Sequence, residues 1–281
     1  MKHRLLFEKL YQASYGYRPL FGGNRTRFLV LLRYFKEARL RRPAIVLDVG
    51  CGTGTFSLEF AKTKAIVIGI DISRTAIKMA NKLAKHASLN NISFVIGDAE
   101  HLPFRSECCD ICLHSELLEH VLNPELVVKK TARVLKKGGL LIASIPSANK
   151  YSFEWIISKL KRKIVRIKEG LYLFYLDTCP RIGHPMFHRF TSEWIIRSYF
   201  KYGVVIEKIE YHAHIFTPLI ELIYNTVKHH LDIRSTLHGA FKNGALYSLL
   251  VEILNKVCSL DYFLLRKVPC GSNMMILGRK H

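Results

Sequence analysis

The chain has 281 residues, a net charge of +21 and seven cysteines, and nearly half of its residues are apolar. This length favours one catalytic domain with insertions over two ordinary domains, and the apolar content suffices for a self-supporting core. The odd number of cysteines argues against a secreted disulfide framework, and the sequence has no run of about 18 apolar residues that could span a membrane.

Residues 1–43 are predicted to form a helical arm ahead of the main domain, which is expected to cover residues 44–281. Residues 1–10 are charged and amphipathic and lack a signal-peptide pattern, so we expect a cytoplasmic protein. Three tyrosines of the arm, Tyr11, Tyr15 and Tyr17, could either close a substrate pocket or simply pack. The arm also carries a basic cluster made of Arg18, Arg25, Arg27, Arg33, Lys36, Arg39, Arg41 and Arg42.

Glycines at alternate positions are the most informative feature of the chain. Residues 46–54 read Val-Leu-Asp-Val-Gly-Cys-Gly-Thr-Gly, an apolar strand followed by Gly50, Gly52 and Gly54. Glycines at these positions allow a tight turn and a close approach to a ligand, and the helix that follows presents free N–H groups. Asp48 would repel a pyrophosphate but suits an amine. The pattern therefore favours a cofactor with an amino-acid moiety over a dinucleotide.

Strand-like and helix-like stretches alternate after this loop. Helix-length stretches at residues 74–89 and 124–135 separate runs rich in Ile and Val, which implies βαβ crossovers and a parallel sheet. The apolar run at residues 140–145 fits a strand covered on both faces, and Gly138-Gly139 is expected to end the preceding helix with a left-handed cap. A helix at residues 193–200 and strands at residues 203–211 and 273–279 are also predicted.

These segments, taken in order, resemble the motifs of class I S-adenosylmethionine-dependent methyltransferases, in particular the type 11, ubiquinone-biosynthesis-like group. After the glycine loop come Ile68-Gly-Ile-Asp-Ile-Ser73, Phe94-Val-Ile-Gly-Asp-Ala-Glu100, Asp110-Ile-Cys-Leu-His-Ser-Glu116 and the stretch at residues 133–146. The likeness covers residues 44–148. It implies a doubly wound α/β fold, in which a mostly parallel seven-stranded sheet has helices on both faces and is closed by antiparallel sixth and seventh strands, with helical insertions.

The resemblance also implies S-adenosylmethionine as cofactor and assigns its contacts. Asp71, about 20 residues after the glycine loop, would accept hydrogen bonds from the ribose hydroxyls. Asp98 would meet the adenine amino group, and the Ala99 N–H would meet the ring. The remaining positions implied are Asp48, Gly50, Cys51, Gly52, Gly54, Ile72 and, through its backbone, His114.

A Glu-x-x-Glu-His sequence after the expected fourth strand supplies the catalytic candidates. Glu116, Glu119 and His120 have the spacing that places side chains on one face of a helix. The sequence resembles one that holds a divalent metal in ubiquinone-pathway O-methyltransferases and in small-RNA 2′-O-methyltransferases. A metal such as Mg²⁺ would lower the pKa of a substrate hydroxyl.

The remaining metal ligand and the metal-free alternatives stay open. His188 is the best candidate for a further ligand, with His184 second. Similar stretches occur in related enzymes without a metal, and there His120 or His114 could act as a general base, or His120 could merely pack against the helix.

Cys109-x-x-Cys112 is predicted to be structural. Such a pair can mark a redox or zinc site, but this one falls within an expected strand, and no second Cys-x-x-Cys accompanies it. We expect both thiols to pack as small apolar groups.

Two insertions, at about residues 149–189 and 215–271, are expected to cover the substrate. Residues 153–168 interleave aromatic and aliphatic side chains with lysines and arginines, as expected of a segment on an anionic membrane surface. The second insertion has apolar residues spaced at three and four, which indicates amphipathic helices that could equally pack on the core or in a dimer. The basic residues could also form a solvated surface or bind nucleic acid.

The sequence therefore predicts an S-adenosylmethionine-dependent methyltransferase. Its acceptor is expected to be an oxygen, or a carbon, of a lipid-like, isoprenoid or other amphipathic small molecule, attacked by in-line displacement. RNA ribose methylation is the alternative. Methylation of base amines is disfavoured, because the chain lacks the Asn-Pro-Pro-Tyr type of motif that many such enzymes use. A non-catalytic binding protein with the same cofactor fold is least favoured. The expected location is the cytoplasm, with peripheral membrane association as an open alternative.

Overall fold

A computed structural model describes residues 23–38, 43–148, 152, 188–220 and 245–281. The three tyrosines of the arm, the amphipathic segment at residues 153–168 and His184 lie outside these residues. Within the expected arm, the described part forms helix α2 (Gly23–Glu37).

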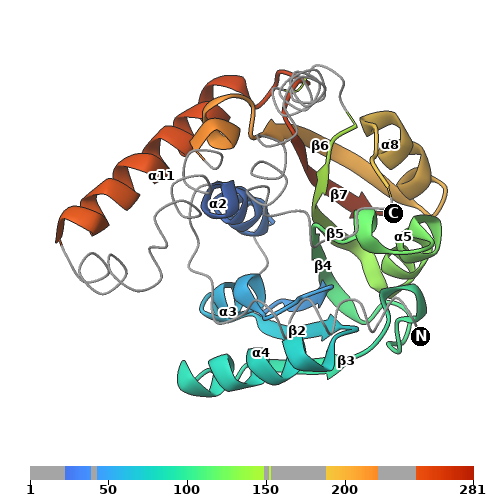
Figure 1. The fold of residues 1–281 in the computed structure, drawn as a ribbon. Coiled ribbons are helices and arrows are strands. Elements are labelled where there is room, and N and C mark those ends of the chain that lie inside the picture. The colour runs from blue at the N-terminus through green and yellow to red at the C-terminus, as the bar shows by residue number, and fades with distance from the viewer. Residues whose placement is uncertain (1–22, 39–42, 149–151, 153–187, 221–244) are drawn as a thin grey trace, which may run out of the picture.

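Seven strands form one sheet in the order β3-β2-β1-β4-β5-β7-β6 (Figure 1). Among the described strands, only β7 is reversed: it lies between β5 and β6 and runs antiparallel to both. The predicted mostly parallel, seven-stranded sheet is thereby confirmed. The strands are β1 (Ile45–Val49), β2 (Ile66–Asp71), β3 (Ile92–Ile96), β4 (Cys109–Ser115), β5 (Leu135–Pro146), β6 (Val204–His212) and β7 (Asn273–Lys280).

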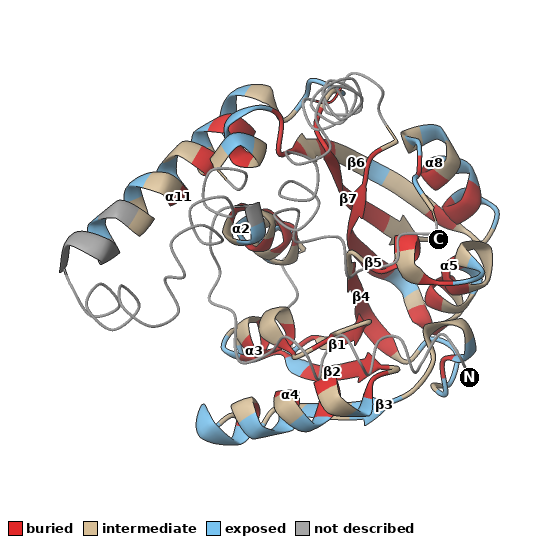
Figure 2. Cartoon of the chain, in the orientation of Figure 1, coloured by how far each residue is buried: buried red, intermediate tan, exposed pale blue. Residues whose placement is uncertain are grey.

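Helices cover both faces of the sheet (Figure 1). Helices α2, α3 (Thr55–Ala61) and α11 (Ala245–Leu265) share an apolar cluster on one face, and α5 (Pro124–Val134) and α8 (Ser192–Phe200) share another on the opposite face. Helix α4 (Arg74–His86) packs on β2 and β3. The buried residues in Figure 2 follow the strands and the helix sides that face them. Cys109 and Cys112 are fully buried in β4, which agrees with a packing role.

The helices begin where the sequence supplies a capping side chain. The Ser73 side chain accepts a hydrogen bond from the Ala76 N–H at the start of α4. The Asn123 side chain accepts one from the Leu126 N–H at the start of α5. Thr191 caps α8 in the same way. Such caps satisfy N–H groups that have no partner within the helix and typically contribute about 1 kcal/mol.

The cap predicted at Gly138-Gly139 is wrong. Helix α5 ends before Leu135, whose backbone is already extended and which pairs with Cys109 of β4. Gly138 does have a positive φ of 74°, but it lies inside β5. The left-handed glycine therefore bends the strand, where the β4–β5 register shifts, and does not end the helix.

Glu210 of β6 links α2 and α11 to the sheet. Its carboxylate accepts hydrogen bonds from Arg33 and Tyr34 on α2 and from Tyr262 on α11. Arg33 also donates to the Tyr262 hydroxyl at 2.6 Å. Burial opposes ionisation of this carboxyl, but the hydrogen bonds from the two tyrosines and the charge of Arg33 outweigh it, so the pKa of Glu210 is lowered. The ionised carboxylate is the form that holds the two helices.

We expect Glu210→Gln to lower the free energy of unfolding at pH 7 by about 2 kcal/mol or more, because hydrogen bonds to a charged group contribute about 1.5–3 kcal/mol each. The folded-state pKa is lowered, so this stabilisation is present above the pKa of an unfolded glutamate, about 4.3, and is lost as the pH falls through the folded value. Urea unfolding at a series of pH values measures both effects.

Glu207→Gln on the same strand is the matched control. Its ion pair with Arg279 is exposed on both sides, so its loss is expected to change stability by less than about 0.5 kcal/mol. Equal destabilisation by the two variants, or a difference between Glu210→Gln and the wild type that does not shrink in acid, would contradict the role of Glu210.

Candidate functional site

The glycine loop joins β1 to α3 and is fixed to β2. Gly50, Gly52 and Gly54 all have positive φ values, of 74°, 54° and 78°. The N–H groups of Gly50 and Cys51 donate to the Ile70 carbonyl at 2.8 and 3.1 Å, and the Gly54 N–H donates to the Cys51 carbonyl at 2.9 Å. Alternating left-handed glycines keep the loop tight, and because they carry no side chains, a ligand at the carboxyl ends of the strands could approach the backbone closely.

Asp71 at the end of β2 holds the same loop from its other side. Its Oδ2 accepts a hydrogen bond from the Gly52 N–H at 2.8 Å, and its Oδ1 accepts one from the Ser73 N–H at 2.9 Å. These two hydrogen bonds hold the carboxylate beside the loop, at the carboxyl end of β2. Ile72, between Asp71 and the cap of α4, is half-buried.

Close packing makes the glycines necessary. A Cβ atom at Gly50 would lie 2.7 Å from the Leu117 side chain, and one at Gly54 would lie 2.7 Å from the Phe94 ring. A Cβ at Gly69 would meet the same ring at 2.5 Å. The backbone of the loop is thus pressed against β2, β3 and the segment after β4.

Asp48 is placed behind the loop. It is buried, and it accepts a hydrogen bond from Ser57 of α3. Burial raises the pKa of Asp48 to about 7 against the effect of the Ser57 hydrogen bond, and the nearby charge of Asp71 adds to the rise. Asp48 therefore ties the start of α3 to β1. Its expected contact with a ligand amine remains a prediction.

Asp98 stands at the next strand end, after β3. It accepts a hydrogen bond from the Glu100 N–H at 2.8 Å, which starts the short helical turn η1 (Ala99–His101), and its side chain is half-exposed. The Gly97 N–H donates to the Asp71 carbonyl at 3.0 Å, so Asp71 and Asp98 follow neighbouring strand ends. The loop, Asp71 and Asp98 fit S-adenosylmethionine, whose ribose and adenine require acceptors at these two places.

Glu100 is a positioning residue that the sequence did not single out. Its Oε1 accepts hydrogen bonds from the N–H groups of Leu122 and Asn123 at 2.8 and 3.0 Å. It thereby connects the turn after β3 with the segment before α5. The sequence around Glu100 does not predict this contact, because the two donors lie more than twenty residues further along the chain.

His114 is a poor candidate for a general base. Its side chain is fully buried, and its Nε2 is hydrogen-bonded to the Tyr199 hydroxyl of α8 at 2.5 Å. Burial lowers the pKa of His114 to about 4, so the ring is neutral at pH 7. The structure thus places this imidazole in the core under α8.

The Glu-x-x-Glu-His residues are not on one helix. Glu116 follows β4 with a left-handed φ of 56°, and only a short turn, η2 (Leu118–His120), comes after it. The helical spacing predicted for Glu116, Glu119 and His120 is therefore wrong, because the chain turns sharply between the strand and α5. Glu116 pairs instead with Arg27 of α2 at 2.8 Å.

The expected metal ligands are neighbours but do not form a ligand set. Glu119 is buried with its Oε1 3.7 Å from the His120 Nε2. The His188 ring is hydrogen-bonded through Nε2 to the Val121 carbonyl at 3.1 Å. In the part of the chain that the structure describes, no group of three or more His, Cys, Asp or Glu side chains could hold a metal ion.

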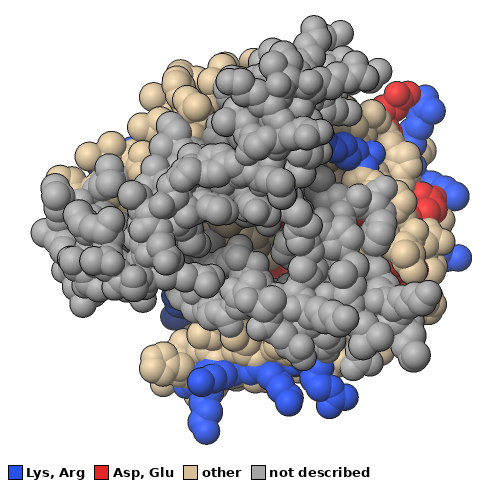
Figure 3. All heavy atoms as spheres, in the orientation of Figure 1, with Lys and Arg blue, Asp and Glu red and all other residues tan. Residues whose placement is uncertain are grey.

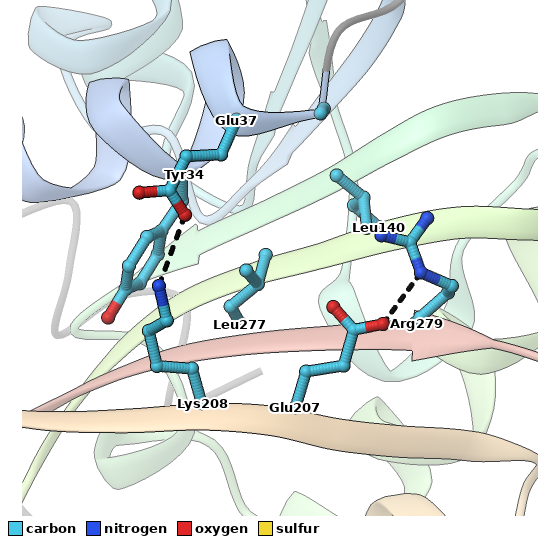
Figure 4. Close-up of a pocket in the computed structure, with 8 residues that line it drawn as sticks. Tyr34, Glu37, Leu140, Glu207, Lys208, Leu277 and Arg279 are labelled. Atoms are coloured by element: carbon cyan, nitrogen blue, oxygen red, sulfur yellow. Dashed lines mark hydrogen bonds and ion pairs between the residues drawn. The ribbon is translucent and has the colours of Figure 1, made fainter.

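A hollow of about 220 Å³ lies between the end of α2 and strands β5, β6 and β7 (Figure 4). Its charged side chains are paired with one another: Lys208 contacts Glu37 at 3.2 Å, and Arg279 contacts Glu207 at 2.7 Å. The hollow is remote from the glycine loop and offers a ligand no unpaired charge, so we do not assign it to the site.

The architecture is that of Rossmann-like methyltransferases. The structure of the [4+2]-cyclase SpnF is similar, with a TM-score of 0.60 at 17% identity, and covers 98% of this chain and 91% of that one. A putative sarcosine dimethylglycine methyltransferase from Galdieria sulphuraria has a TM-score of 0.60 at 13% identity and covers 100% and 98%. These likenesses show the fold alone, and a cyclase among them shows that the fold does not fix the reaction.

Residues 47–143 match the family described as a methyltransferase domain. The ubiquinone biosynthesis O-methyltransferase of Coxiella burnetii is 38% identical over 120 residues, which are 43% of this chain and 51% of the relative. The enzyme of that name from Chelativorans sp. is 32% identical over 147 residues, 50% and 58% of the two chains. The chain spans about half the length of these curated relatives. Its residues 47–143 are thus similar to a methyltransferase domain, in line with the resemblance stated from the sequence.

Proposed function

We propose that this protein transfers a methyl group from S-adenosylmethionine to an oxygen of an amphipathic small molecule, with transfer to carbon as a close variant. The observation that carries the proposal is the glycine loop held by Asp71, because Asp71 accepts a hydrogen bond from the Gly52 N–H and so places a carboxylate beside the loop, where a ribose would require an acceptor. S-adenosylmethionine, held by the glycine loop and Asp71, would supply an electrophilic methyl group whose C–S bonding pair stays on sulfur, and the acceptor hydroxyl would release its proton to water.

An amphipathic acceptor is supported by two observations. The two relatives described above, which match part of the chain, are named for ubiquinone biosynthesis. Apolar side chains are exposed on α11, among them Leu249, Ile253 and Phe263. Among the described residues, no helix combines the length and apolar content needed to cross a membrane. A metal is not part of the proposal, because Glu116 is engaged by Arg27.

Calorimetry with S-adenosylmethionine and its demethylated product tests cofactor binding first. A screen of candidate acceptors with isotopically labelled methyl donor, read by mass spectrometry, then tests transfer. Heat of binding together with labelled product from a lipid-like hydroxyl compound supports the proposal. Absence of cofactor binding contradicts it, and labelling of RNA ribose alone shifts the function to RNA methylation.

A basic stripe on α4 offers a way to hold the protein at an anionic surface. Arg74, Lys78, Lys82 and Lys85 are exposed and spaced to share one helix face, and α4 has no acidic residue. Figure 3 shows Lys and Arg side chains along the edge that α4 forms. The stripe was not among the basic clusters singled out in the sequence.

We expect the triple variant Lys78→Glu, Lys82→Glu and Lys85→Glu to bind anionic vesicles about a hundredfold more weakly, since each lysine near such a surface contributes about 1 kcal/mol. Sedimentation with phosphatidylserine-containing vesicles measures the loss. The control carries the same charge change at scattered exposed lysines, Lys129, Lys137 and Lys267. Equal loss in both variants, or retention of the wild type only by RNA with a steep salt dependence, would contradict a membrane role.

A further inference from the structure

Four polar side chains lie near one another beside the glycine loop, and they serve none of the cofactor contacts described above. We call them the Arg27 cluster: Arg27 of α2, Glu116 after β4, His212 at the end of β6 and Asn273 at the start of β7. Arg27 and Glu116 form an ion pair at 2.8 Å, and their side chains are 12% and 23% exposed. The pair is therefore largely withdrawn from solvent.

His212 and Asn273 lie on the face of the sheet that α2 covers. They are direct cross-strand partners in the β6–β7 pairing. Side chains alternate between faces along a strand, and Glu210, two residues before His212, binds α2. Met275, two residues after Asn273, packs in the apolar cluster that includes α2. Burial, together with the positive charge of nearby Arg27, lowers the pKa of His212 to about 3, so the ring is neutral.

Several polar atoms of this cluster have no hydrogen-bond partner among the residues that the structure describes. They are both ring nitrogens of His212, the Nε of Arg27 and the Oδ1 of Asn273. His212 is 2% exposed and Asn273 is 5% exposed, so water does not bathe them freely. Leaving a buried polar group unpaired costs about 1–3 kcal/mol, and native proteins contain few such groups. Their gathering in one place points to a ligand.

The cluster adjoins the cofactor loop. The Arg27 guanidinium lies 5.8 Å from the ring of Phe56, in the first turn of α3 directly after the loop. Leu117, next to Glu116, touches Gly50 so closely that a Cβ there would lie 2.7 Å away. A ligand held by the cluster would therefore lie next to the cofactor.

Backbone strain occurs at the same two strand ends. Glu116 after β4 and Ala213 after β6 have left-handed φ values of 56° and 60°. Such a conformation costs a residue other than glycine about 1–2 kcal/mol, and strained residues concentrate at functional sites. The strain at these two strand ends is additional support for a ligand site there.

The unpartnered atoms select the chemistry of the ligand. The Arg27 Nε–H and one His212 nitrogen are donors, whereas the other His212 nitrogen and the Asn273 Oδ1 are acceptors. A neutral hydroxyl group both donates and accepts, so it can satisfy such a mixed set. A carboxylate or phosphate only accepts, and it would add negative charge beside Glu116, which already balances Arg27.

We propose that the Arg27 cluster binds the head group of the methyl acceptor and that this head group is a neutral hydroxyl compound. The apolar body of the acceptor would continue along Ile215, Phe216 and Leu219, which follow His212 closely and are 43%, 40% and 37% exposed. The inference rests on the proposed function, since it identifies the acceptor site of that reaction.

Nuclear magnetic resonance of protein labelled at its histidine rings and arginine side chains tests the site without any turnover. The protein is saturated with the demethylated cofactor product, and octyl glycerol ether or octanoate is added as the probe. We expect the glycerol ether to shift the ring signals of His212 and the Nε signal of Arg27, and octanoate to leave them unchanged. The signals are assigned by their disappearance in His212→Phe and Arg27→Gln.

Binding measurements on variants give a second readout. His212→Phe is expected to weaken octyl glycerol ether binding about tenfold, as loss of one hydrogen bond predicts. His86→Phe, on the exposed side of α4, should leave it unchanged. Retained binding of the cofactor product shows that each variant is folded, and His212→Asn replaces His212→Phe if the latter does not fold.

The outcomes separate the two claims. Equal or stronger binding of octanoate, or ring signals that neither probe moves, would overturn the acceptor site. If methyl transfer proceeds while His212→Phe keeps the affinity for the acceptor, the site is wrong and the function stands. If the glycerol ether shifts His212 but no acceptor is ever methylated, the site stands and the proposed function fails.

Discussion

Replacing Asp71 by alanine is expected to weaken S-adenosylmethionine binding by about a hundredfold or more. The variant loses the acceptors of the Gly52 and Ser73 N–H groups, at 2.8 and 2.9 Å, and with them the fixed shape of the loop. It also loses the acceptor expected for the ribose. Hydrogen bonds to a charged group contribute about 1.5–3 kcal/mol each, and about 1.4 kcal/mol corresponds to a tenfold change in affinity. Calorimetric titration measures the effect.

Two further variants define the cause of this loss. Asp71→Asn keeps the size of the side chain but removes its charge and turns an amide group toward the loop, so we expect an intermediate affinity. Glu59→Gln breaks only a partly exposed ion pair between α3 and Lys62, the residue that follows it, and should leave the affinity unchanged. Wild-type affinity in Asp71→Ala would exclude this carboxylate from the cofactor site.

Gly54→Ala is expected to lower the free energy of unfolding by about 2–5 kcal/mol and to weaken cofactor binding. The left-handed φ of 78° costs alanine about 1–2 kcal/mol. The new methyl group would also lie 2.7 Å from the Phe94 ring, and such overpacking costs about 1–3 kcal/mol. Relief of the clash moves the ring or the loop, and with it the ligand. Urea unfolding and calorimetry measure the two effects.

Gly138→Ala separates strain from crowding. Gly138 has nearly the same φ, 74°, but a Cβ there meets nothing within 4 Å. We expect this variant to lose only about 1–2 kcal/mol and to bind the cofactor as the wild type does. If the two variants lost equal stability, the contact between Gly54 and Phe94 would be unimportant. If Gly138→Ala also weakened cofactor binding, weaker binding by Gly54→Ala could not be attributed to the glycine loop.

The arrangement of the candidate cofactor residues was predictable because its signals are local. Gly50, Gly52 and Gly54 follow a strand directly, and each adopts the left-handed conformation for which glycine is suited. Asp71 ends β2 and Asp98 follows β3, and parallel strands deliver such residues to one edge of a sheet. Chain order and residue type were sufficient.

The acceptor half was not predictable, because its residues come from distant segments. Arg27 is on the first described helix, and Asn273 is on the last strand. They share a site only because β7 inserts beside β5 with β6 outside it. For Glu116 the sequence predicted a proximity that is not formed on a helix. Its spacing to His120 fits a helix, but Glu116 itself is left-handed and turns the chain at the end of β4. Periodicity cannot reveal where a strand ends.

The place of β7 in the sheet constrains the order in which the protein can be assembled. β6 joins the sheet only through β7, yet it is made sixty residues earlier on the ribosome. Until residues 273–280 emerge, β6 has no neighbour, and one edge of β5 offers unpaired N–H and C=O groups that invite pairing with other chains. Synthesis of β7 is therefore the step that joins β6 to the nascent sheet, and stalling before it would favour aggregation.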